Sequence, residues 1–291
     1  MAIKEHIRHP LEWGADQLKT ANVAVERASH SVRDPAEAGD RTALPVRRIE
    51  IGDLKEVLAK GLSDFGVYRT DVIFLCIIYP LAGLVLASLA FGYDMLPLLF
   101  PLASGFALIG PVAAVGLYEM SRRREQGVDI SWKDAFGVVS APAFGAILAL
   151  GLVLVAIFLL WLAVAYAIYA VTLGPAPPAS IGAFAADVLT TGAGWALIVV
   201  GVGVGALFAL LVLAISVVSF PLLLDRDVGL HRAVATSVRA VMTNPVPMLA
   251  WGLIVAGGLV IGSIPVLLGL IIVMPVLGHA TWHLYRKVVP R

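Results

Sequence analysis

Long apolar stretches alternate with short polar segments along most of this chain. Five stretches contain no Asp, Glu, Lys or Arg: residues 72–93, 95–118, 135–186, 188–224 and 240–285. A helix needs about 20 apolar residues to cross the hydrocarbon core of a bilayer. The last stretch is long enough for two such helices and is divided at Gly262-Ser263-Ile264-Pro265. The pattern therefore predicts six crossings.

The predicted fold is all-α, a polytopic membrane helix bundle whose six transmembrane helices form three hairpins. The spans are expected at residues 72–91, 97–119, 143–171, 194–221, 246–262 and 265–284. The fifth span is short and follows Asn244-Pro245-Val246-Pro247. A re-entrant hairpin over residues 246–284 is therefore the alternative for the last two spans, and it also returns the chain to the same side.

The basic residues are segregated along the chain. All 21 Lys and Arg fall into four of the seven segments left between the spans, and the segments around Asp94, Asp187 and Ser263 contain none. Short loops rich in Lys and Arg stay on the cytoplasmic side of a membrane. This alternation places both termini in the cytoplasm. The expected partners of the basic segments are the bilayer and its anionic lipids, not nucleic acid.

Residues 1–45 are expected to form a flexible cytoplasmic tail, and residues 46–291 a membrane domain. That domain is predicted to repeat three times, over residues 50–124, 125–226 and 227–287. Each repeat would begin with a cytoplasmic amphipathic helix and continue into a hairpin of two spans.

The three amphipathic helices are expected from apolar stripes at helical spacing. The first stripe is Ile51, Leu54, Leu58, Leu62 and Phe65, opposite Asp53, Glu56, Lys60 and Asp64. The second is Trp132, Phe136 and Val139, opposite Lys133 and Gly137. The third is Leu230, Val234, Val238 and Val241, opposite Arg232, Thr236 and Arg239.

Composition supports a membrane protein and restricts its chemistry. The chain is 59% hydrophobic and only 14% charged, whereas soluble domains are about 25% charged. Its single cysteine, Cys76, excludes an intramolecular disulfide and a cysteine-based metal cluster. No Ser-His-Asp arrangement, phosphate loop or HExxH motif is present, so no catalytic residues are predicted.

His279 and His283 form the most specific polar pattern. Two histidines at i and i+4 lie on one face of a helix, a geometry that can bind zinc, copper or haem iron. A metal site needs further ligands, and no other histidine lies in the predicted spans. The alternative is that both rings are hydrogen-bonded to Glu119, Asp225 or lipid phosphate near the cytoplasmic end of the last span.

A second candidate is a polar cluster of Glu119, Arg122, Asp225 and Arg226. Each carboxylate ends an even-numbered span, and arginines follow it closely. Carboxylates within a membrane are functional candidates, but a structural ion pair at a helix end explains them as well. On the opposite side, Asp94 and Asp187 are expected in solvated loops.

Three blocks resemble a family of uncharacterised bacterial, mainly proteobacterial, integral membrane proteins. They run from Gly110 to Phe136 (with GLYEMSRRREQG and SWKDAF), from Ser219 to Arg226 (SFPLLLDR) and from Pro275 to Lys287 (PVLGHATWHLYRK). The resemblance implies a membrane class and no catalytic residues. Together with the predicted topology, the expected location is a bacterial inner membrane. Some members are labelled as similar to cytochrome c oxidase subunit I, which needs more histidine ligands than the two this chain offers.

Three functions are compatible with these features. The first is a non-enzymatic accessory, assembly or scaffold component of a membrane complex, with other subunits of that complex as partners. The second is a small-solute or ion transporter or channel, in which the prolines, glycines and polar cluster would form a path. The third is a haem- or copper-binding membrane protein related to respiratory oxidases; the first two functions require no cofactor.

Overall fold

A computed structural model describes residues 43–77, 95–128 and 141–291, together with positions 80, 81, 83–85, 88, 135 and 137–139. Every regular element among these residues is helical, which confirms the all-α class. Several predictions lie outside the described residues. They concern nearly all of the tail, residues 78, 79, 82, 86, 87 and 89–91 of the span expected at 72–91, Asp94, and Trp132, Lys133 and Phe136 of the second amphipathic helix.

Four described helices are long and apolar enough to cross a membrane: Leu96–Glu125, Phe144–Thr172, Gly192–Asp225 and Pro245–Ser263. They correspond to the second to fifth predicted spans. The first consists of the short η1 (Leu96–Leu98), α4 (Leu99–Ala113) and α5 (Val115–Glu125), and the second is α6 (Phe144–Thr172). The third consists of α8 (Gly192–Ser216) and α9 (Ser219–Asp225), and the fourth is α11 (Pro245–Ser263).

The arrangement of six spans in three hairpins stays a prediction. The last helix, α12 (Leu270–Val288), begins five residues later than the expected sixth span. Val266 and Leu267, in the turn before it, have positive φ angles of 52° and 66°. These two left-handed residues interrupt the helix after Pro265. The C-terminal half of α12 carries the polar residues His279, His283, Arg286 and Lys287.

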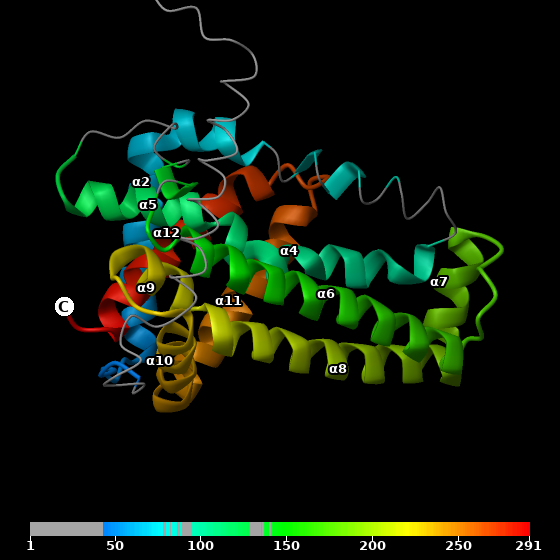
Figure 1. Cartoon of the computed structure of the whole chain (residues 1–291). Coiled ribbons are helices and arrows are strands. Elements are labelled where there is room, and N and C mark those ends of the chain that lie inside the picture. Colours follow the sequence, from blue (N-terminus) through cyan, green and yellow to red (C-terminus); the bar gives the residue numbers. More distant parts are fainter. Residues whose placement is uncertain are drawn as a thin grey trace, which may run out of the picture.

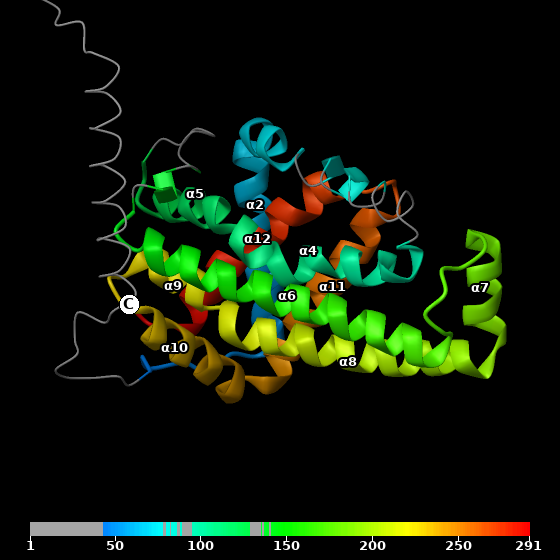
Figure 2. The same cartoon turned by 45° about the vertical axis from the view of Figure 1, so that its right-hand side comes forward.

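The first amphipathic helix differs from the prediction. It does not end near Phe65 but continues without a break as α2 (Ile51–Cys76). In both views α4, α6 and α8 run side by side, and α2 runs across them near one end (Figures 1 and 2). Its most extensive contact is with α12. At Gly61 the two backbones are so close that an added Cβ would lie 2.7 Å from the backbone nitrogen of Ala280.

At the other end of the bundle, α7 (Ile181–Thr190) stands across the ends of α6 and α8 (Figures 1 and 2). The sequence predicted a solvated loop around Asp187; Asp187 is exposed, but it lies in a helix and not in a loop. The Ser180 hydroxyl caps the helix by accepting a hydrogen bond from the Ala183 amide, 3.1 Å away. Capping satisfies one of the free amides at a helix start, and the preceding Gly174-Pro175 segment separates α7 from α6.

The helix α10 (Leu230–Thr243) confirms the third amphipathic segment, and Leu230, Val234 and Val241 of its apolar stripe are partly buried against the core. The residues packed inward are Ala233, Thr236, Ser237 and Ala240, whereas Val238 is exposed. The Thr236 hydroxyl donates to the Arg232 carbonyl and accepts from the Leu44 amide, so its burial leaves no unsatisfied group. Small residues allow α10 to approach α8 and α9 closely.

Candidate functional site at the charged end

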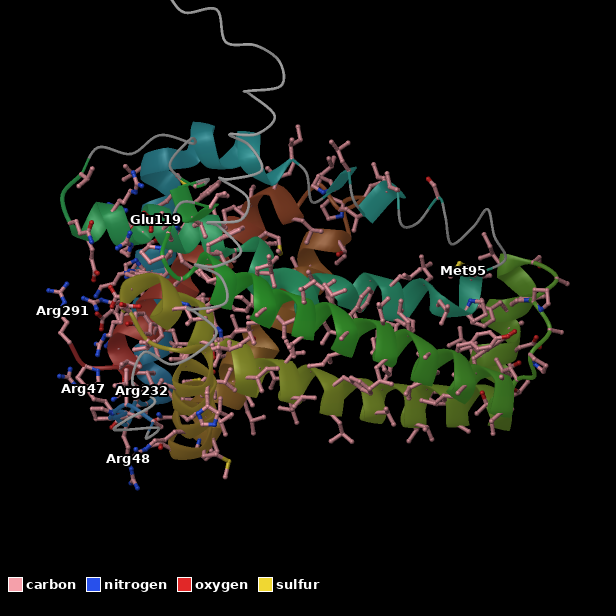
Figure 3. The ribbon with its side chains drawn as sticks, in the orientation of Figure 1. Arg47, Arg48, Met95, Glu119, Arg232 and Arg291 are labelled. Atoms are coloured by element: carbon pink, nitrogen blue, oxygen red, sulfur yellow. The ribbon has the colours of Figure 1, made fainter. Side chains whose placement is uncertain are left out.

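The charged residues gather at one end of the bundle, where α2, α5, α9, α10 and the C-terminal half of α12 meet. We call this the charged end. Figure 3 shows Arg47, Arg48, Glu119, Arg232 and Arg291 there, with Met95 at the opposite end. The predicted candidates all lie there: Glu119, Arg122, Asp225, His279 and His283 belong to the helices that meet, and Arg226 directly follows α9. The structure therefore brings the two predicted polar groups to the same end.

Asp64 lies at the centre of the most deeply buried polar contacts. Its side chain is 6% exposed and connects three helices. The Ser121 hydroxyl of α5 donates to Asp64 Oδ2 at 2.6 Å, and His283 Nε2 of α12 lies 3.0 Å from the same oxygen. Arg124 pairs with the other oxygen, Oδ1. We call Asp64, Ser121, Arg124, His279 and His283 the buried cluster.

The hydrogen bonds of the buried cluster fix the protons of its two histidines. An ionised Asp64 only accepts hydrogen bonds, so His283 must carry a proton on Nε2. Because Ser121 donates to Asp64, its oxygen is left to accept from His279 Nδ1, 2.8 Å away. The His279 ring is fully buried, and its Nε2 has no hydrogen-bond partner in the described structure. The chain of donors thus runs from His279 through Ser121 to Asp64.

The surroundings of Asp64 favour its charged form. Burial alone would raise the pKa of this carboxyl. The hydrogen bonds from His283 and Ser121 outweigh burial, so the pKa lies below the usual value of 3.8. Asp64 is therefore a carboxylate at neutral pH, held by donors from α5 and α12.

Glu119 and Asp225 are also occupied by neighbouring groups. Arg122 binds Glu119 through Nε and Nη2 at 2.8 and 3.0 Å, and Arg123 Nε donates at 2.7 Å. This confirms the ion pair expected for Glu119. Asp225 accepts from the Tyr285 hydroxyl at 2.6 Å and from Arg286 at 3.2 Å. Asp225 therefore joins α9 to α12.

A more exposed set of charges joins the start of α2 to the end of α12. Lys287 Nζ lies 2.7 Å from Asp53 and 2.6 Å from Glu56. Hydrogen bonds from Lys287 and then from Lys60 lower the pKa of Glu56 to about 2. The same contacts raise the pKa of Lys287. Solvent reaches all of these groups, so each pair stabilises the fold only slightly.

Each of the two predicted metal ligands uses one ring nitrogen in a hydrogen bond within the buried cluster. His279 Nδ1 faces Ser121 and His283 Nε2 faces Asp64. In the described part of the chain, no group of three or more His, Cys, Asp or Glu residues could hold a metal ion. Binding of haem or copper remains an untested prediction.

The sequence interpretation missed the partner of the histidines. Asp64 was placed on the polar face of its helix, but the structure buries it. The expected partners Glu119 and Asp225 bind arginines and Tyr285 instead. One signal was present in the sequence: Gly61 lies one turn before Asp64, and a small residue there allows another helix to approach closely.

Comparison with known proteins supports the membrane class. Residues 99–225 match the model of a family described as predicted integral membrane protein (DUF2189). The matched segment runs from α4 to α9 and includes Glu119, Ser121 and Asp225. This confirms the predicted resemblance to an integral membrane family of unknown function. No curated protein and no solved structure matches the chain.

Proposed function

We propose that this protein has a non-enzymatic role as an accessory, assembly or scaffold component of a larger membrane complex. In this proposal the protein lies in a bacterial inner membrane with the charged end in the cytoplasm. The basic residues concentrated at that end support this orientation. Other subunits contact the rigid surface of the charged end.

The observation that carries the proposal is the burial and mutual bonding of the polar groups. A catalytic acid or base must reach its substrate. The side chains of Asp64 and Glu119 are only 6% and 3% exposed, and each is bound by several donors from the protein. Groups held in this way fix the positions of helices. They build a surface and do not act on a small molecule.

The surface outside these groups offers positions for contact. Three exposed residues lie at the charged end. Arg48 is on the segment before α2, Lys55 is on α2 and His231 is on α10. Residues 43–50, which lead into α2, are themselves fixed. The buried Asn244 side chain accepts from the Ile49 amide at 2.8 Å and donates to the Arg47 carbonyl at 3.0 Å. Arg48 is therefore presented from an ordered backbone.

The test is purification of the tagged protein from native membranes under mild detergent. We expect one or more proteins to co-purify in stoichiometric amounts. The double variant Arg48→Glu/Lys55→Glu should lose them, whereas Ala179→Glu, at the opposite end of the bundle, should retain them. Recovery of the protein alone, or equal loss in both variants, would contradict the proposal.

Transport and cofactor binding make different predictions for the same purified protein. A transporter would produce solute or ion flux in proteoliposomes, because it requires a polar path through the bundle. A haem protein would show a Soret band, and a copper protein would contain bound copper, each lost in His279→Ala or His283→Ala. Either result would replace the scaffold proposal.

A further inference from the structure

An open pocket lies at the charged end, between the ends of α5 and α9 and the last residues of the chain. Its volume is about 460 Å³. Four arginines line it, together with two acidic residues: Arg122, Arg226, Arg286, Arg291, Glu125 and Asp225. The buried cluster is not part of its lining. The pocket is therefore a separate feature of the same end.

The charged side chains of the lining leave a positive excess. Four guanidinium groups and two carboxylates give a net charge of 4 − 2 = +2. Guanidinium groups remain protonated at all accessible pH values. An anion with two negative charges would balance this excess.

Neighbouring groups hold three of the arginines in place. Arg122 uses Nε and Nη2 to bind Glu119, so its Nη1 group is not part of that pair. Arg286 contacts Asp225 and Glu125, and its guanidinium carbon lies 5.9 Å from the centre of the Trp282 ring. Arg226 donates to the Pro290 carbonyl. Guanidinium groups that are already oriented lose less entropy when a ligand binds.

The fourth arginine of the lining, Arg291, is the most exposed of the four. The Arg291 side chain is 77% exposed, and its Nη2 lies 3.7 Å from Glu125. Such a weak, solvated contact is easily exchanged for a ligand. By contrast, the side chains of Arg122, Arg226 and Arg286 are 28%, 27% and 13% exposed. The pocket thus combines three positioned cations with one adaptable cation.

We propose that this pocket binds a phosphate monoester, with the phosphate oxygens bound by the four arginines. Arginine pairs with phosphate through parallel N–H···O bonds, and a monoester carries nearly two negative charges at neutral pH. The volume leaves room for a small organic group beside the phosphate. The same chemistry is presented by a lipid such as phosphatidic acid and by a soluble phosphorylated molecule. This inference does not depend on the scaffold proposal.

The test uses full-length protein in phosphatidylcholine nanodiscs. In one arm, inorganic phosphate and glycerol 3-phosphate are titrated calorimetrically. In the other, nanodiscs containing phosphatidic acid are prepared, and retained lipid is counted by native mass spectrometry. The variants are Arg291→Gln and Arg226→Gln/Arg291→Gln. The matched control is Arg48→Gln, an exposed arginine at the same end but outside the pocket lining.

We expect saturable binding in at least one arm, and the arm that responds identifies a soluble or a lipid source. Each arginine removed should weaken binding about tenfold, since it removes a charge-assisted hydrogen bond. Arg48→Gln should bind as the wild type does. Arg291→Gln removes an exposed side chain, so it tests the proposal even if the double variant does not fold. Absence of binding in both arms, unchanged binding in Arg291→Gln, or equal weakening in Arg48→Gln would overturn the proposal.

Discussion

Replacing Asp64 by asparagine tests whether the buried cluster holds α2 against α5 and α12. The substitution preserves size and removes the charge. It also replaces one acceptor oxygen by an NH₂ donor. If that group takes the place of Oδ1, it faces the Arg124 guanidinium; if it takes the place of Oδ2, it faces Ser121 and His283. In the first orientation two donors meet and the Arg124 contact is lost. In the second, the NH₂ group meets the proton on His283 Nε2, so at least one contact is lost in either orientation.

The expected cost follows from the contacts and their exposure. Removing one partner of a buried ion pair costs about 3–5 kcal/mol. The side chains of Arg124 and His283 are 31% and 14% exposed, so water can solvate them partly after the change. Because the asparagine oxygen keeps some of the hydrogen bonds, we reduce the expected loss in the free energy of unfolding to about 2–3 kcal/mol.

The measurement is the free energy of unfolding in mild detergent, obtained by steric trapping or by titration with a denaturing detergent. The matched control is Asp227→Asn, which changes an exposed carboxylate between α9 and α10. The control should change stability by less than about 0.5 kcal/mol, as surface substitutions usually do. If Asp64→Asn were as stable as this control, the assignment of Asp64 as a buried link between helices would be refuted.

Three further predictions concern other contacts of α2 and its neighbours. Gly61→Val should clearly lower the melting temperature because a Cβ there meets the α12 backbone. Gly52→Ala is the control: a Cβ there meets nothing within 4 Å, so the melting temperature should be unchanged or slightly raised. Equal effects of the two substitutions would contradict the close packing of α2 and α12. Asn244→Ala should speed tryptic cleavage after Arg47 and Arg48 by removing two hydrogen bonds that fix this segment, and an unchanged cleavage rate would contradict that role. Lys287→Met should lower the free energy of unfolding slightly at low salt and not at high salt. In the wild type, the stabilisation from Glu56 should be full above its ordinary pKa of 4.5 and be lost as the pH falls through about 2. An effect independent of salt and pH would count against the Glu56–Lys287 pair.

The four helices that are long and apolar enough to cross a membrane were predictable from the length of the apolar stretches. The bounds of α6 differ by one residue from the expected 143–171, and those of α11 by one residue from 246–262. A helix that crosses lipid satisfies its backbone hydrogen bonds internally. A long apolar stretch therefore predicts a helix whichever other helices pack against it. The breaks that divide the second and fourth spans are local, and a proline inside a helix explains the first of them. One follows Pro111 closely, and the other lies at Val217 and Val218.

The contacts between helices were not predictable by the same reasoning. A helical stripe shows which residues share a face but not which face meets protein, lipid or water. Asp64 lies on a polar face that α5 and α12 cover, and Thr236 lies on a polar face that packs inward. In both cases a second partner, Ser121 or the Leu44 amide, satisfies the buried group, and that partner is distant in sequence.

The central claim is that the charged end contacts other subunits, and site-specific photo-crosslinking in native membranes tests it most directly. A photoreactive amino acid would be placed at Lys55 on α2, at His231 on α10 and, as the control, at Ala179 before α7. All three positions are exposed. The account predicts discrete crosslinked products to the same protein from Lys55 and His231 and none from Ala179. Products from Ala179 alone, or only lipid adducts from all three positions, would contradict it.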